Sequence, residues 1–240
     1  MSPFAYTRDL PRRFYKRAEA RERGDMFTVT LDGRTLKTPA KANFETPTRA
    51  LAQACADEWD AQAELIRAET MPITRLVNVA LDWTPGAREE LAAQVARFGE
   101  TDLLCHRAAS PAPLVARETR IWEPLLVWGR DTLGAPLVAG VGVLPRPQPD
   151  AALAALARAA EELGDFHLTG VAHAAGLAGS AIIAFALARG AVDVEAAFAA
   201  AALDELYQIE TWGEDHEARR RLDGLKSELA ALAVYFAALA

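Results

Sequence analysis

Residues 26–39 read MFTVTLDGRTLKTP, and this stretch sets the fold class. Its first half, Met26 to Leu31, is rich in β-branched and aromatic residues, which favour strands. The pair Asp32-Gly33 is typical of a two-residue hairpin turn, because Asp and Gly both tolerate a positive φ. We therefore predict an antiparallel hairpin whose return strand covers residues 34–38. It ends at Pro39, which has no amide hydrogen for a ladder bond.

Short extended segments flank this hairpin, and then the pattern changes to helices. Residues 13–18 and 43–46 are predicted to be extended. From Thr46, a plausible N-cap followed by proline, apolar residues recur with helical spacing as far as Gln62. A second helix is predicted over residues 73–82. A small sheet with two helices is therefore expected in the first third of the chain.

Strand signals nearly stop after Pro85-Gly86. Helices are predicted over residues 87–98, 114–130, 150–163, 166–189, 194–212 and 214–239. The helix over 166–189 is hydrophobic nearly all round, so we expect it at the centre of the core. Its glycines, Gly170, Gly176 and Gly179, are interpreted as positions of close helix packing. Strands first and helices afterwards indicate an α+β fold: a small N-terminal sheet-containing domain (1–85, with the antiparallel hairpin), then a larger all-helical domain (86–240).

Composition narrows the class of protein. The chain has 240 residues, of which 51% are hydrophobic and 25% charged, as in ordinary globular proteins. The formal net charge of −7 disfavours nucleic acid and anionic lipid as partners. No apolar run approaches the ~20 residues of a membrane helix, and the N-terminus has no apolar core of a secretory signal. Two lone cysteines, Cys55 and Cys105, suit a reducing compartment. We expect a cytoplasmic protein that is monomeric when free and does not insert into membranes.

Common catalytic and cofactor motifs are not evident in the sequence. There is no glycine-rich phosphate loop and no dinucleotide fingerprint after a strand. Ser180 lacks the flanking glycines of a nucleophile elbow. His167 and His173 are six residues apart, which is the wrong spacing for one helix face. The sequence therefore predicts no catalytic residue, no cofactor and no metal.

An acidic segment, residues 203–218, stands out instead. It reads LDELYQIETWGEDHEA and holds six acids and no Lys or Arg, with Trp212-Gly213 at its middle. Gly213 is expected to end one helix, and acids at the start of the next are favoured by its dipole, each by ~0.3–1 kcal/mol. One interpretation is that Trp212 packs into the hinge between two helices and that the acids around it are simply solvated. The other is a docking surface, in which the aromatic anchors an arginine-bearing partner and the charge steers it.

Seven motifs occur in a fixed order along the chain: RFYK (13–16), LDGRTLKTP (31–39), EWDAQ (58–62), TMP (70–72), TDLLC (101–105), WEPLLVW (122–128) and DELYQIETWGEDHEA (204–218). Together they resemble the Atp-twelve family, the chaperones that assemble the catalytic sector of ATP synthase. The resemblance covers residues 13–236, nearly the whole chain. It implies a fold like the one predicted above.

The resemblance also implies a function and a site. The chain is expected to bind the unassembled α subunit of the ATP synthase catalytic sector and to protect it until it assembles with β, without enzymatic activity. A bacterial member is expected in the cytoplasm, and organellar relatives in the mitochondrial matrix. Carried over from the family, the partner-binding residues are Asp204, Glu205, Gln208, Trp212, Glu214, Asp215 and Glu217. Phe14, Trp59 and Pro72 lie in family motifs and are expected to be structural. The alternative is a small enzyme or metal-binding protein that uses the Asp204–Glu217 carboxylates.

Overall fold

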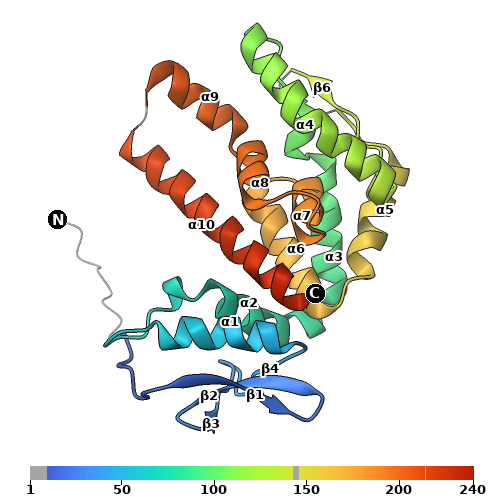
Figure 1. The fold of residues 1–240 in the computed structure, drawn as a ribbon. Coiled ribbons are helices and arrows are strands. Elements are labelled where there is room, and N and C mark those ends of the chain that lie inside the picture. The colour runs from blue at the N-terminus through green and yellow to red at the C-terminus, as the bar shows by residue number, and fades with distance from the viewer. Residues whose placement is uncertain (1–9, 143–145, 214) are drawn as a thin grey trace, which may run out of the picture.

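The computed structural model describes residues 10–142, 146–213 and 215–240, and it places a small sheet before a larger helical part (Figure 1). Strand β2 is hydrogen-bonded to β1, β3 and β4, and all three pairings are antiparallel. The strands of this sheet are β1 (Ala18–Arg23), β2 (Met26–Leu31), β3 (Arg34–Thr35) and β4 (Glu45–Thr46). The α+β fold class is confirmed.

The predicted hairpin is confirmed, with a shorter return strand. Both turn residues have a positive φ, 49° at Asp32 and 81° at Gly33. Beyond β3, Leu36 N still donates to Val29 O (2.8 Å), and Lys37 then pairs with Asn43 in an isolated bridge across the turn that follows Pro39. The strand predicted over residues 13–18 is misplaced along the chain: β1 begins at Ala18. The preceding residues bond to residues 64–66 instead, through Arg13 N to Glu64 O (2.9 Å) and Ile66 N to Pro11 O (2.8 Å).

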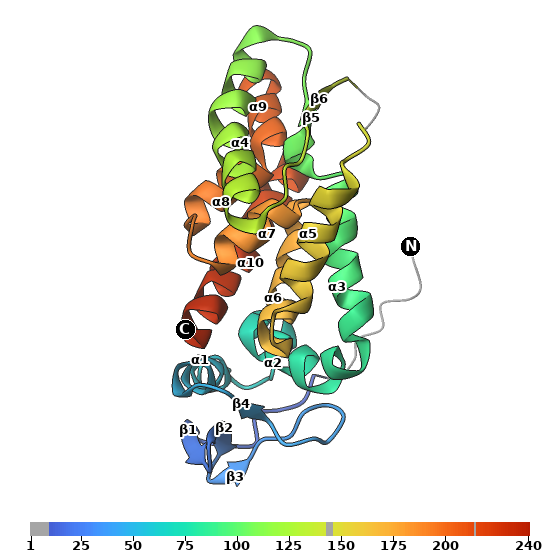
Figure 2. The ribbon, with the colours of Figure 1, turned by 90° about the vertical axis from the view of Figure 1, so that its right-hand side faces the viewer.

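Helices α1 (Arg49–Asp60) and α2 (Pro72–Asp82) lie between the sheet and the remaining helices (Figure 2). A short 3₁₀ helix, η1 (Ala68–Thr70), precedes α2. Thr48, and not the predicted Thr46, caps α1, since the amide of Leu51 donates to its hydroxyl at 3.1 Å. Thr46 belongs to β4, where its hydroxyl donates to the carbonyl of Phe27.

The larger helical part holds the rest of the described elements. These are α3 (Thr84–Glu100), η2 (Leu103–Cys105), β5 (His106–Arg107), α4 (Ala112–Leu133), β6 (Gly140–Val141), α5 (Asp150–Glu161), α6 (Asp165–Ala178), α7 (Ala181–Ala188), α8 (Val194–Ala201), α9 (Leu203–Trp212) and α10 (His216–Leu239). Within the described ranges, no helix combines the length and the apolar character needed to cross a membrane.

The apolar segment 166–189 forms two helices rather than the predicted one. Gly179 ends α6 with φ 63°, and the hydroxyl of Ser180 caps α7 by accepting from Ile183 N at 3.1 Å. The fully buried carboxyl of Asp102 accepts from Leu104 N (3.1 Å) and Ile182 N (3.3 Å) at the same break. The predicted place in the core is confirmed, because every residue from Ala181 to Leu187 is buried. The predicted helix 194–212 is likewise divided, at Ala202.

The three glycines of this segment have different roles. A Cβ at Gly170 would lie 2.6 Å from the ring of Phe236, so close packing of α6 on α10 is confirmed there. A Cβ at Gly176 would have no neighbour within 4 Å, so the packing interpretation is wrong at that position. At Gly179 the backbone conformation, and not packing, requires glycine.

Helix α10 connects the acidic segment with the region of the sheet. Its first turn lies beside the end of α9, and its last turns lie against α1 (Figure 1). The hydroxyl of Thr48 donates to Ala238 O, and the hydroxyl of Tyr235 donates to Phe166 O at 2.9 Å. Helix α3 begins at Thr84, close to residue 85, where the domain boundary stays a prediction.

Candidate partner-binding surface

Helix α9 buries little of its surface against the rest of the molecule. It follows the alanine-rich α8 at Ala202 and ends at Gly213, which has φ 93°. Leu203 is its only buried residue among those described. The remaining side chains of α9 are half-buried or exposed. Such a helix depends on polar contacts to hold its place, because little apolar area is buried beneath it.

Two of the acids on α9 form ion pairs with arginines of neighbouring helices. Arg117 of α4 donates to both carboxylate oxygens of Glu210, at 2.8 and 2.7 Å, and its guanidinium lies over the ring of Tyr207. Arg221 of α10 pairs with Glu205, with Nε 3.2 Å from Oε2. The Arg117 guanidinium lowers the pKa of the Glu210 carboxyl. These pairs hold α9 between α4 and α10.

Asp204 faces the interior instead of solvent. Its Oδ1 atom is buried and has no hydrogen-bond partner among the described residues, and burial raises the pKa of its carboxyl. Glu118 of α4 lies beside it and accepts from Ala108 N at 3.0 Å. Burial, followed by the nearby charge of Asp204, raises the pKa of Glu118. Asp204 is therefore part of the α4–α9 contact.

The remaining predicted residues lie at the surface, around the turn from α9 to α10. Gln208 is exposed, and Trp212 is 76% exposed, the most exposed of the large hydrophobic side chains in the described ranges. Asp215 caps α10 by accepting from Glu217 N (2.8 Å) and Ala218 N (2.7 Å), and these bonds lower its pKa. The side chain of Glu217 is exposed. Glu214 lies outside the described residues.

The structure thus divides the predicted set. Gln208, Trp212 and Glu217 are available on the surface, while Glu205 is engaged by an arginine and Asp204 is partly buried. The pairing residues Arg117, Glu118 and Arg221 did not emerge from the sequence, because nothing in it shows that α4 and α10 pack against α9. Within the described ranges, no cluster of three or more His, Cys, Asp or Glu side chains could hold a metal ion.

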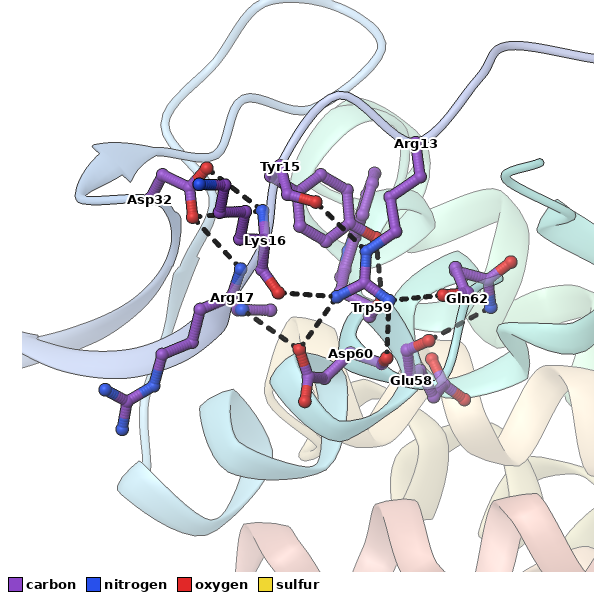
Figure 3. A network of polar contacts seen from close by, with 10 residues as sticks. Arg13, Tyr15, Lys16, Arg17, Asp32, Glu58, Trp59, Asp60 and Gln62 are labelled. Carbon is purple, nitrogen blue, oxygen red and sulfur yellow. Dashed lines mark hydrogen bonds and ion pairs between the residues drawn. The ribbon is translucent and has the colours of Figure 1, made fainter. Parts of the chain in front are cut away.

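A second polar cluster lies where the chain enters the sheet, around Arg13 (Figure 3). The Arg13 guanidinium donates to the carbonyls of Tyr15, Lys16, Asp60 and Gln62 and to the carboxylate of Asp60. The Tyr15 hydroxyl donates to Trp59 O at 2.6 Å. The RFYK and EWDAQ motifs therefore meet in space, and together they fasten residues 13–16 to the end of α1.

The three residues predicted to be structural differ in their surroundings. Trp59 is half-buried and packs edge-on against Tyr15 with a centroid distance of 5.7 Å. Pro72 opens α2, where the Glu58 carboxylate accepts from Ile73 N (2.8 Å) and Thr74 N (2.7 Å). Phe14 is 73% exposed and contacts the ring of Tyr15. A structural role for these three residues stays a prediction.

Comparison with known proteins bears on the class of this protein. The family described as "ATP12 chaperone protein" matches residues 12–130. "Protein atp12, mitochondrial" from Schizosaccharomyces pombe is 27% identical over 236 residues, covering 93% of this chain and 81% of that protein. Atp12 from Paracoccus denitrificans is 34% identical with a TM-score of 0.89, covering 95% of this chain and 98% of that one. The Atu1473 protein of Agrobacterium tumefaciens is 40% identical with a TM-score of 0.91, covering 96% and 87%.

An α+β protein with this fold and this degree of identity to Atp12 is a chaperone. The chain belongs to the ATP12 family, the Atp-twelve family of the sequence motifs, and its role is in the assembly of ATP synthase.

Proposed function

We propose that this chain binds the unassembled α subunit of the ATP synthase catalytic sector and holds it until it assembles with the β subunit. The binding surface consists of the turn between α9 and α10 with the exposed side chains around it, Gln208, Trp212, Asp215 and Glu217. Glu214 is included in this surface because of its place in the sequence. Glu205 and Asp204 support the surface by holding α9 against its neighbours. The chain acts by binding alone and carries out no catalytic step.

The exposed indole of Trp212 beside acidic side chains is the observation that carries this proposal. Large aromatic side chains at the centre of an interface contribute most of the binding energy, and an exposed indole has apolar area to bury. Carboxylates around it attract a basic partner and raise the association rate. An arginine of the α subunit is the complementary group.

The ion pairs of α9 suit a surface that has to exchange partners. Glu210 is 57% exposed in its pair with Arg117, and Arg221 is 65% exposed in its pair with Glu205. The other partner of each pair is less exposed, Arg117 at 28% and Glu205 at 24%, so each pair holds α9 and still has one side chain open to solvent. An incoming arginine can therefore reach Glu210 and take the place of Arg117.

Holding a subunit for later release requires a moderate interface. An unassembled subunit exposes the apolar surface that its partner would cover, and such surfaces aggregate. An apolar centre with a polar, charged rim shields this surface and still dissociates. We infer that the free chain is a monomer of two units, residues 1–85 and 86–240. It acts in the bacterial cytoplasm, and its organellar relatives act in the mitochondrial matrix.

Capture of isolated ATP synthase α subunit tests the proposal. Trp212→Ala should weaken binding about 30-fold, as expected for a central aromatic residue. Glu217→Lys should slow association severalfold, and added salt should reduce the difference, because rim charges act mainly on the encounter. Both variants should keep the helical circular dichroism of the parent chain.

Glu162→Lys, an exposed charge reversal at the end of α5, is the matched control. Light scattering should show that the parent chain and this control keep the α subunit soluble. Equal capture by the parent chain, Trp212→Ala and Glu217→Lys would refute the proposed surface. Failure of the parent chain to capture the α subunit would refute the proposed function.

A further inference from the structure

A cavity of about 290 Å³ lies between the loop after β3, the end of α1 and α2, and none of the described residues of α9 lines it. Its walls include Pro39, Trp59, Ile66 and Met71, so most of its lining is apolar. The LDGRTLKTP, EWDAQ and TMP motifs each contribute residues to it. These motifs are not used by the surface at α9 and α10.

Buried polar atoms without partners lie in the walls of this cavity. Trp59 Nε1 and Asn78 Oδ1 belong to lining residues, are covered from solvent and have no hydrogen-bond partner among the described residues. Buried polar groups in proteins are nearly always paired, so an unpaired donor and an unpaired acceptor at one cavity indicate a missing partner.

Two long basic side chains complete the lining. The Lys37 ammonium donates to the neutral side chain of Asn43, so its charge is not balanced by that contact. Arg75 is paired with Glu228 of α10 at 2.7 Å. Both basic side chains are exposed, and their long aliphatic stems allow a change of rotamer when a ligand enters the cavity. The rim therefore favours an acidic neighbour near Lys37.

We propose that this cavity binds an extended peptide segment of the client protein, with one large apolar side chain next to an Asp or Glu. The apolar side chain fills the cavity. A backbone carbonyl of the segment accepts from Trp59 Nε1, a backbone amide donates to Asn78 Oδ1, and the acidic side chain pairs with Lys37. Rotation of Lys37 and Arg75 precedes these contacts. This inference rests on the proposed function, since the client is the α subunit.

The chemistry of the cavity selects this ligand. A peptide unit offers one donor and one acceptor, which matches the unpaired acceptor of Asn78 and the unpaired donor of Trp59. The volume is at or below the lower end of the ~300–1,000 Å³ of small-molecule sites, which suits a single side chain better than a cofactor. Recognition by an apolar pocket together with backbone hydrogen bonds is a common mode of peptide binding.

Binding of 15-residue peptides that span the ATP synthase α subunit tests the proposal, with the full chain labelled and the peptides immobilised. Peptides with a large apolar residue beside Asp or Glu should bind the parent chain. Trp59→Phe keeps an aromatic side chain but removes the N–H group together with the five-membered ring, and it should weaken binding of these peptides about fivefold. Lys37→Glu should weaken the binding of these peptides further. It should have a smaller effect on peptides in which Asn or Gln replaces the Asp or Glu.

Two variants serve as matched controls. Trp83→Phe changes an exposed indole at the end of α2, outside this cavity, and Lys41→Glu reverses a charge in the same loop as Lys37. Both should bind the peptides like the parent chain. Equal weakening by Trp59→Phe and Trp83→Phe would refute peptide binding at this cavity. So would a parent chain that captures the intact α subunit but binds none of the peptides. Neither result would refute the proposed function. Peptide binding that depends on Trp59, in a chain that fails to capture the intact subunit, would refute the proposed function alone.

Discussion

Arg13 makes five hydrogen bonds, four of them to backbone carbonyls, and the three to Asp60 and Gln62 fasten the start of the described chain to the end of α1. A guanidinium offers five N–H groups in a fixed plane, and a lysine ammonium offers three on a flexible stem. We therefore expect Arg13→Lys to lower the free energy of unfolding by about 2 kcal/mol. Urea denaturation measures this, with the exposed neighbour Arg12→Lys as control. Equal midpoints for the two variants would contradict the prediction.

Asp102 gives the stability of the protein a dependence on pH. Burial raises the pKa of its carboxyl from 3.8 to about 6. Between these values the folded state binds more protons than the unfolded state, so the contribution of this group to stability falls as the pH rises. Above pH 6 the charged form carries the whole penalty, about 3 kcal/mol.

Asp102→Asn removes the titrating group, so the parent chain should lose stability relative to this variant between pH 4 and pH 6, and no further above that range. Denaturation midpoints of the two proteins at several pH values measure the difference. Other acidic groups are common to both proteins and cancel. A difference that is constant from pH 4 to pH 7 would rule out this role for Asp102.

At the scale of elements, α9 depends on the polar contacts with its neighbours. Its ion pair with Arg117 joins it to α4, and Leu203 is the only residue of α9 that is buried among those described. We expect Arg117→Gln to speed amide hydrogen exchange in α9 severalfold and to leave the exchange in α7 unchanged. It should also strengthen capture of the α subunit, because Glu210 is then free to pair with the client.

Arg130→Gln is the matched control, since Arg130 pairs with Asp131 within α4 itself. Exchange measured by mass spectrometry should be the same in this control and in the parent chain. High salt should speed exchange in the parent α9 and change Arg117→Gln less, because salt screens the ion pair. Unaltered exchange in Arg117→Gln would show that α9 is held by other contacts.

At the scale of the whole molecule, α10 joins the two ends of the structure, and its packing on α6 leaves no space at Gly170. A Cβ there would lie 2.6 Å from Phe236, so Gly170→Ala should destabilise the chain by about 1–3 kcal/mol. Gly176→Ala, two turns along the same helix, meets no neighbour within 4 Å and should stabilise by up to about 1 kcal/mol. Thermal denaturation of both variants measures the contrast, and a shift in the same direction would contradict it.

Much of the fold follows from local patterns. The hairpin at Asp32-Gly33 and the burial of α7 were both predicted correctly, since turns and apolar runs depend on nearby residues. The break of the apolar segment at Gly179 was missed. Its local signals were a glycine that can end a helix and a serine that can cap the next, Gly179 and Ser180, but the apolar run around them favoured one continuous helix. The bond from Ile182 N to the buried carboxyl of Asp102, which adds to this break, joins residues distant in sequence and has no local signal.

The α+β order, the family motifs and the acidic segment around an aromatic residue can all be read from the chain, because they depend on composition and spacing. Which of those acids are available depends on how the helices pack. Their packing pairs Glu210 with Arg117, pairs Glu205 with Arg221 and turns Asp204 toward Glu118. The partners come from α4 and α10. The fold sets which distant charges form ion pairs and which side chains become buried.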